Sequence, residues 1–420
     1  MPVGSNLPQK SVILRYPPTS TNVSNLLNFE REGEESYQLL ELPPEIIKAV
    51  EAKRSNNEAN DKDNFFPLTI KGKPSDDAVL CTPNSTFLLR TVGISNSILV
   101  CRTPSSSSSA TSSSSTLQIR DTCHEIIECL PISPNLDRIQ MILKKSSWKG
   151  LGINSSFNLG KRKREEEKVK KWTRDQLNSV IQASDEELEI GLKERNVIEF
   201  QGKMLLLPPK ELKELLSIIL SLLTIHNFGP GKLNLSPSKP IIECLENDHE
   251  ISNEIIKEVL KLFGELSKKD EEEEIWKANI KKIIKEIGNG LLIGVKDKKL
   301  IEFEKEWKEE IGEEWKDEID IKLLEGEYLI SNGPINSITF NSLNDNKFIT
   351  HFPLSSLPIQ PLQRFTDLFL TKSKWNPEEI LPFLKGLTCE GDIKSRDKLI
   401  VKFVRVVKEK DGIWWYPRRS

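Results

Sequence analysis

The sequence has few of the side chains from which catalytic sites are usually built. It contains only 4 histidines in 420 residues, and none of them stands among acidic residues in a motif. Gly229–Lys232 has only the end of a phosphate-binding loop, and no Gly-x-Ser-x-Gly segment occurs. Gly288, Gly290 and Gly294 lack the spacing of a dinucleotide-binding fingerprint. Because no nucleophile, base and oxyanion group can be assembled, we predict that the protein is not an enzyme and holds no cofactor.

Cysteine is also scarce and scattered. The cysteines are Cys81, Cys101, Cys123, Cys129, Cys244 and Cys389. They form no closely spaced framework, which fits a reducing compartment. Cys123, His124 and Cys129 lack the fourth ligand of a structural zinc site, so we predict no metal. We also expect no secretory signal at the N-terminus and no membrane span, because the longest apolar-rich stretch, 212–225, is too short.

The net charge of the chain gives no indication of nucleic-acid binding, but the distribution of charge along the chain does. The formal net charge is -3, with 37% hydrophobic and 29% charged residues, which predicts folded modules joined by solvated linkers. Residues 302–318 hold nine acidic residues and three lysines, a surface that should repel DNA. Residues 391–420 hold nine bases and four acids, so a case for nucleic acid rests on this end of the chain.

We predict an α+β fold in several modules. The expected parts are an arm at 1–35, a β-rich partner-binding domain at 36–145 with a serine-rich insertion at 104–116, a basic linker at 146–171, and three winged helices at 172–240, 241–335 and 336–420. The insertion and the linker are too polar to bury a core.

Short β-branched runs between turn residues predict antiparallel strands in the N-terminal domain. The runs are 37–42, 67–71, 78–81, 86–92 and 97–100. Several are apolar on both faces, so each face must be covered. The domain is too short to close a large barrel alone, and we expect other chains to complete its sheet. The apolar residues expected to meet those chains are Leu68, Ile70, Val79, Leu80, Phe87 and Leu89.

Two capping boxes mark the next module. Thr173 with Gln176, and Ser184 with Glu187, each predict the start of a helix. Strands at 197–200 and 204–207 surround a tight turn at Gln201-Gly202, and a helix at about 210–223 follows. Helix, turn, helix and hairpin is the plan of a winged helix.

The later modules are predicted in outline. In the second we expect helices at 252–266 and 275–287, a strand or buried connection at 291–295, and a helix face at Phe303, Trp307 and Ile311. In the third we expect helices at 361–370 and 395–407, an N-cap at Asn376 followed by Pro377, and a strand at 413–416.

The C-terminal bases are the best nucleic-acid candidates. The candidate DNA-binding residues are Lys394, Arg396, Lys398, Lys402, Arg405, Lys408, Lys410, Trp414, Arg418 and Arg419. In a winged helix they would lie on the recognition helix and the wing, where phosphate is contacted. Trp414 and Trp415 alternate across a strand, so one can be core and the other available for stacking. An ordinary solvated helix face with a core tryptophan explains the pattern equally well.

A short basic run lies in the linker. It consists of Lys161, Arg162, Lys163 and Arg164 and resembles a nuclear-import signal. A plain solvated linker is the alternative reading. If the run is an import signal, the protein is nuclear.

Several stretches, in order along the chain, resemble one family. The stretches are 68–72 with 77–81, 181–188, 364–369 with 374–380, and 417–419. They are similar to the sister-chromatid-cohesion subunit of the alternative replication factor C clamp loader. The resemblance implies a non-catalytic subunit whose N-terminal strands interlock with a small partner and the tail of the large ATPase subunit. It also implies that the winged helices contact the catalytic subunit of DNA polymerase epsilon and DNA, and that the complex loads PCNA.

Two other classes of protein remain. A free-standing winged-helix transcription regulator would read bases through the helix predicted at 395–407. A hydrolase or transferase is disfavoured by the missing motifs.

Overall fold

The computed structural model describes residues 12–15, 37–55, 68–102, 115–151, 170–229, 234–268, 274–331, 347–389, 391–410 and 412–418. They form an α+β protein, as predicted, in two compact units. The first unit comprises Met1–Thr82 and Phe87–Pro131, and the second comprises Pro83–Thr86 and Ile132–Ser420. Lys161 to Arg164 and Arg419 lie outside the described residues.

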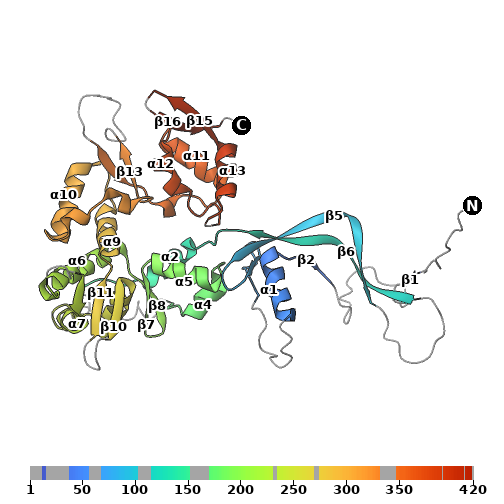
Figure 1. Cartoon of the computed structure of the whole chain (residues 1–420), viewed down its shortest axis with the longest axis horizontal. Helices are drawn as coiled ribbons and strands as arrows, with labels where there is room; N and C mark the ends of the chain where they lie inside the picture. The colour runs from blue at the N-terminus through green and yellow to red at the C-terminus, as the bar shows by residue number, and fades with distance from the viewer. Residues whose placement is uncertain are drawn as a thin grey trace, which may run out of the picture. The chain divides into compact units, whose positions relative to one another are not determined.

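Two strands of 17 residues dominate the first unit. β5 (Thr86–Arg102) and β6 (Ser115–Pro131) form a long antiparallel ribbon, seen in cyan in Figure 1. β3 (Thr69–Lys71) and β4 (Val79–Cys81) continue the sheet beyond β5. β1 (Val12–Arg15) and β2 (Leu39–Glu41) pair with β6 in parallel, so the prediction of a purely antiparallel sheet is wrong. Neither strand is joined to β6 by a hairpin, and only a hairpin would impose the antiparallel direction.

The two strands predicted at 86–92 and 97–100 form a single strand, β5. Sequence patterns place a break between 92 and 97, but β5 runs through it with a shift of register between Gly93 and Ile98. Such a bulge absorbs the extra residues and increases the twist of the ribbon. The only cluster of fully buried apolar residues among the unit's described residues joins Ile46, Leu80 and Phe87. Ile46 comes from α1 (Pro44–Ser55), a helix that the sequence analysis did not predict.

The second unit repeats one plan of elements. A helix is followed by a short strand or a single strand-like residue, two further helical segments, and a hairpin. The last strand of each hairpin lies between its partner and that short strand or residue. Among the described residues the plan occurs four times.

The first two repeats are as follows. One consists of α2 (Asp137–Leu143), Trp172, α4 (Arg174–Val180), α5 (Asp185–Glu194), β7 (Val197–Phe200) and β8 (Lys203–Leu206). The next consists of α6 (Pro209–His226), β9 (Leu235–Pro237), α7 (Ser238–Asn247), α8 (Asn253–Leu262), β10 (Gly264–Lys268) and β11 (Glu274–Ala278). Both predicted capping boxes are confirmed at the starts of α4 and α5.

The last two repeats complete the chain. One consists of α9 (Ile280–Leu292), β12 (Lys298–Lys299), α10 (Leu300–Ile311), the 3-10 turn Ile321–Leu324, β13 (Tyr328–Ser331) and β14 (Phe348–His351). The other consists of α11 (Pro361–Thr371), Trp375, α12 (Pro377–Ile380), α13 (Ile393–Phe403), β15 (Val404–Glu409) and β16 (Gly412–Pro417).

Three of the predicted helices have a wrong boundary in the structure. They are the helices predicted at 252–266, 275–287 and 395–407. The helix predicted at 252–266 ends at Leu262, because Gly264–Lys268 pair with Glu274–Ala278 in the β10–β11 hairpin. The helix predicted at 275–287 begins only at Ile280, because Trp276 is buried on strand β11. The segment predicted as 291–295 is the last turn of α9 and the connection after it.

The third error affects the candidate DNA surface. The helix predicted at 395–407 ends at Phe403, and β15 begins at Val404. The β-branched residues Val404, Val406 and Val407 pair with β16, and strands favour such side chains. Arg405 and Lys408 therefore lie on the hairpin and not on the helix.

Large apolar cores hold the second unit together. One continuous core joins α6, α8, α9 and α10 and includes the buried indoles of Trp276 and Trp307. The predicted helix face of Phe303, Trp307 and Ile311 is confirmed as part of it. Separate cores fill the first and the last repeats, the latter around Trp375.

Candidate functional site

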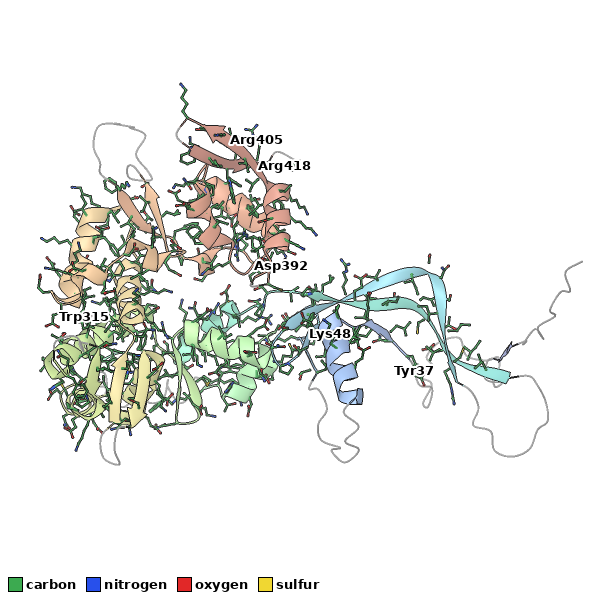
Figure 2. All side chains as sticks on the ribbon, in the orientation of Figure 1. Tyr37, Lys48, Trp315, Asp392, Arg405 and Arg418 are labelled. Carbon is green, nitrogen blue, oxygen red and sulfur yellow. The ribbon has the colours of Figure 1, made fainter. Side chains whose placement is uncertain are left out.

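The last repeat presents most of its basic side chains on one helix and one hairpin. Lys394, Lys398 and Lys402 are exposed on α13. Arg405 and Lys408 are exposed on β15, and Lys410 follows that strand (Figure 2 labels Arg405). With Arg418, which is also exposed, the structure places seven of the ten predicted DNA-binding residues at the surface of one repeat as exposed bases.

Helix α13 owes its start to one carboxylate. The Asp392 side chain accepts the Ser395 backbone N–H at 3.0 Å and acts as the N-cap. Hydrogen bonds from the Ser395 hydroxyl and backbone lower the pKa of Asp392, so the cap stays ionised at neutral pH. The helix is anchored at its other end by Phe403, whose ring stacks on Phe365 with centroids 5.0 Å apart.

Two of the predicted DNA-binding residues, Arg418 and Arg396, also have partners within the chain. The Arg418 guanidinium donates to the Val401 carbonyl oxygen at 2.6 Å, and its backbone N–H donates to the Phe403 carbonyl oxygen at 2.9 Å. Arg418 thereby closes the C-terminal end of α13, where a cation is favoured. Arg396 is half-buried, and its guanidinium lies 3.4 Å from the Asp397 carboxylate.

The two adjacent tryptophans face opposite sides of the hairpin, as predicted. Trp415 is buried, and its backbone forms a bridge with Trp375 through hydrogen bonds of 2.8 and 3.0 Å. Trp414 is half-buried, with the Lys374 ammonium 4.2 Å from its ring centroid. Lys374 in turn pairs with the Glu409 carboxylate at 2.7 Å. Lys374 therefore covers part of the Trp414 ring face on which a nucleic-acid base would stack.

The repeats differ in the charge of the helix before the hairpin. In the last repeat, α13 carries four bases and one acid. In the first repeat, α5 carries five acids and one base. Because a phosphate backbone requires cations, α13 suits nucleic acid and α5 does not. Glu187, one of these five acids and part of the capping box of α5, also accepts the Thr86 hydroxyl at 2.5 Å.

The first unit offers a different surface, one of exposed apolar residues. Of the six residues predicted to meet partner chains, Val79, Leu80 and Phe87 are buried in the unit itself, and Leu68 and Leu89 are half-buried. Ile70 is 67% exposed.

Other apolar residues of the ribbon are more accessible. Ile98 is 39% and Leu99 37% exposed, and as neighbours on β5 they point to opposite faces. Tyr37 and Leu40 are exposed beside β6 (Tyr37 is labelled in Figure 2). The alternation of apolar residues in the sequence predicted the strands. It did not predict which apolar side chains would remain exposed.

A family comparison decides where the chain belongs. The family model described as "Sister chromatid cohesion protein Dcc1" matches residues 37–384. This chain belongs to the Dcc1 family of sister chromatid cohesion proteins. The match includes the β5–β6 ribbon and the first three repeats, and it stops before α13 and the final hairpin.

Curated relatives from distant organisms agree with the Dcc1 assignment. The human sister chromatid cohesion protein is 24% identical over 87% of this chain and 84% of its own length. A probable sister chromatid cohesion protein of Dictyostelium discoideum is 25% identical over 94% of this chain and 97% of its own length. The Saccharomyces cerevisiae protein is 22% identical over 89% and 94%. The predicted family is therefore confirmed.

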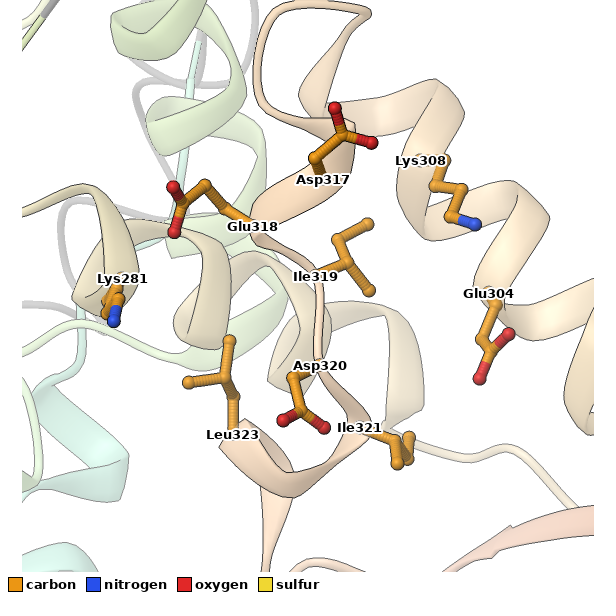
Figure 3. Close-up of a pocket in the computed structure, with 9 residues that line it drawn as sticks. All are labelled: Lys281, Glu304, Lys308, Asp317, Glu318, Ile319, Asp320, Ile321 and Leu323. Atoms are coloured by element: carbon orange, nitrogen blue, oxygen red, sulfur yellow. The ribbon is translucent and has the colours of Figure 1, made fainter.

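One hollow of this Dcc1-family chain lies among described residues of the second unit. Figure 3 shows this hollow of about 470 Å³, lined by Lys281, Glu304, Lys308, Asp317, Glu318, Ile319, Asp320, Ile321 and Leu323. Its lysines and carboxylates are the side chains of a solvated groove. Within the described ranges, no three His, Cys, Asp or Glu side chains are grouped to hold a metal ion, and no helix could span a membrane. Cys123 donates to the Tyr37 carbonyl oxygen at 3.4 Å.

Proposed function

We propose that this chain is a non-catalytic subunit of an alternative replication factor C clamp loader. In this role it links the loader to DNA polymerase epsilon and to DNA, and it supports PCNA loading, DNA replication and sister chromatid cohesion. Membership of the Dcc1 family supports the role in cohesion. ATP hydrolysis then belongs to other subunits.

The observation that carries the proposal is the uncovered ribbon of the first unit. Ile98 and Leu99 expose neighbouring apolar side chains on opposite faces of β5, so a single covering layer cannot bury both. Partner chains that pack on both faces of the ribbon would bury these side chains, as apolar patches at protein interfaces are buried. We propose that the large ATPase subunit and the small subunit of the complex add strands and side chains to complete this sheet.

The repeats of the second unit supply the other contacts. Their order of elements and the central position of the last strand are those of winged helices, and we propose that each repeat is one. The basic α13 and its hairpin then contact DNA phosphates, while the repeats without a basic helix contact the polymerase catalytic subunit. The run from Lys161 to Arg164 directs import into the nucleus.

Co-expression tests the partner contacts. The free full-length chain should self-associate through the first unit, and co-expression with the two partner chains should give a soluble complex. In that complex Ile98→Ser with Leu99→Ser should reduce recovery of the partners at least tenfold. The matched control is Ile190→Ser, an exposed residue of α5 in the second unit, which should leave recovery unchanged. A monodisperse free chain that forms no complex on mixing would reject the proposal.

DNA binding separates the proposal from a transcription regulator. Charge reversal at Lys398, Lys402 and Arg405 should weaken binding to any sequence equally and make it less dependent on salt. A regulator would instead prefer one base sequence by about 1–3 kcal/mol per base pair read. A strong sequence preference lost in that variant would favour the regulator.

A further inference from the structure

The first repeat carries a second basic surface. It lies along the edge of β8 that does not pair with β7. β8 pairs with β7 along one edge, and two other segments are hydrogen-bonded to its other edge. The Trp148 N–H donates to the Leu206 carbonyl oxygen at 2.9 Å, and the Met204 N–H donates to the Trp172 carbonyl oxygen at 2.8 Å. Because Met204 and Leu206 are two residues apart on one strand, the attachment points are about 7 Å apart.

The two attached segments are rich in lysine and contain no acid. Residues 144–151 hold three lysines and residues 170–174 hold two lysines and one arginine. Lys144, Lys145, Lys149, Lys170 and Lys171 are all exposed. Among the described residues, the acids that border these segments are Asp175 and Glu211, the latter beside Gly150. Arg174 is already paired with Glu189 at 2.9 Å, so the lysines define the surface.

Half-buried tryptophans fix both segments in place. Trp148 packs against the large core of the second unit, and Trp172 packs against the core of the first repeat. The Lys170 ammonium lies 3.7 Å from the centroid of the Trp172 ring. Hydroxyl groups of Ser146 and Ser147 donate to the Leu143 and Lys144 carbonyl oxygens, which hold the turn that displays Lys144 and Lys145. The lysines therefore extend from a supported backbone.

We infer that Lys144, Lys145, Lys149, Lys170 and Lys171 bind the sugar–phosphate backbone of nucleic acid. Among the residues that the structure describes, Lys144, Lys145 and Lys171 form no ion pair with an acid. Lysine is a flexible point charge that contacts phosphate without selecting a base. The α5 helix, which would read DNA in a winged helix, is acidic, so this repeat would engage the backbone through its β8 edge.

This inference rests on the proposed function in binding DNA and adds a second DNA contact, in the first repeat. A chain that holds DNA at two repeats would be anchored against rotation and would depend more steeply on salt than one basic helix alone allows. Each phosphate contact contributes about 0.9 to the slope of log affinity against log salt. Loss of the β8-edge contacts should therefore make the slope shallower by roughly two or more.

Charge reversal in the full-length chain tests this surface. We compare K144E/K145E/K170E/K171E with a matched control, K239E/K257E/K296E/K305E, which reverses four exposed lysines of the middle repeats. Affinities for labelled single-stranded and double-stranded DNA are measured over a range of salt. We expect the first variant to bind at least tenfold more weakly with a shallower salt slope than the control. Equal affinity and slope in the two variants would overturn the inference.

Two further measurements separate the possible failures. If reversal at Lys398, Lys402 and Arg405 weakens DNA binding and the β8-edge variant does not, the inference fails and the proposed function stands. If only the β8-edge variant weakens binding, the inference stands and the assignment to α13 fails. Acetylation footprinting of the unmodified chain should show Lys144, Lys145, Lys170 and Lys171 protected by DNA. Protection by polyglutamate but not by DNA would overturn the inference in favour of an acidic protein partner.

Discussion

The two units of this chain treat their apolar residues in opposite ways. In the second unit, helices from successive repeats bury tryptophan and aliphatic side chains in a continuous core. In the first unit, two 17-residue strands expose apolar side chains on both faces, and the described core is a small cluster around Ile46, Leu80 and Phe87. A sheet needs a layer on each apolar face, whereas helices that pack on each other supply their own.

Carboxylates show the same contrast. Burial, with a further contribution from nearby Glu286, raises the pKa of Glu327 in the second unit to about 7. In the first unit, backbone N–H groups of Tyr37 and Thr122 donate to the exposed Asp121 carboxylate and lower its pKa. Desolvation thus raises the pKa of Glu327, whereas hydrogen bonds to the charged form lower the pKa of Asp121. The contrast can be tested with single substitutions.

The largest effect is expected from Trp307→Ala in the second unit. The indole is fully buried, donates to the Ile284 carbonyl oxygen at 3.1 Å, and packs where Gly288 leaves room. Its removal should lower the free energy of unfolding of this unit by about 3–5 kcal/mol. Denaturant unfolding followed by circular dichroism measures the change, with Trp307→Phe as the milder control. A loss below about 1 kcal/mol would mean that the core is not closed.

A smaller effect is expected from the partly buried carboxyl group of Glu327. Because the pKa of Glu327 is about 7 in the folded chain and near 4.5 when unfolded, the unfolded state releases its proton first as pH rises. Stability should fall by on the order of 2 kcal/mol between pH 4.5 and 7 and then level off. Glu327→Gln should remove this decline, as thermal unfolding across that range would show. The same decline in the variant would assign it to another group.

The border between the units provides the next test. Thr86 begins β5 but belongs to the second unit, where its hydroxyl oxygen accepts the Ser184 N–H at 2.9 Å. Ser184 is the N-cap of α5, and its hydroxyl accepts the Glu187 N–H at 3.2 Å. Ser184→Ala should cost about 1 kcal/mol. The control Ser179→Ala, at an exposed site, should cost less than about 0.5 kcal/mol, and equal losses would contradict the capping role.

The smallest change in the free chain is expected from the ribbon. Ile98→Ala or Leu99→Ala should alter the free energy of unfolding by about 1 kcal/mol or less, because more than a third of each side chain is already exposed. Phe87→Ala, in the buried cluster of the same unit, should cost several times more and serves as the internal reference. A loss of about 2 kcal/mol at Leu99 would show that the free chain covers that face itself.

Local signals in the sequence predicted local structure well. The capping boxes at Thr173 and Ser184 fixed two helix starts, and the turn at Gln201-Gly202 takes the left-handed backbone, with φ of 51° and 69°. The β10–β11 hairpin was missed because its strands are charged and follow an amphipathic helix without a break in composition. The helix gives way to a strand whose residues pair across the hairpin, as Gly264 does with Ala278, and no local pattern reveals that pairing.

The candidate surfaces were predicted less completely. The clustering of charge in the sequence pointed to Lys398, Lys402 and Arg405. The β-branched residues between Val404 and Val407 favour a strand, but the sequence analysis included them in the preceding helix. The structural roles of Arg418 and Lys374 depend on carbonyl and carboxylate partners far away in the sequence. Exposure of Ile98 and Leu99 depends on what the rest of the chain fails to cover, which is a property of the whole fold.

Hydrogen exchange in the β5–β6 ribbon tests the central claim most directly. We compare amides of residues 86–102 and 115–131 in the free full-length chain and in the complex with the two proposed partner chains. A ribbon without covering layers opens at little cost, so exchange in the free chain should be fast compared with α6 and α9 of the second unit. The complex should slow it strongly. Exchange in the free chain as slow as in α6 and α9, unchanged by the partners, would contradict the account.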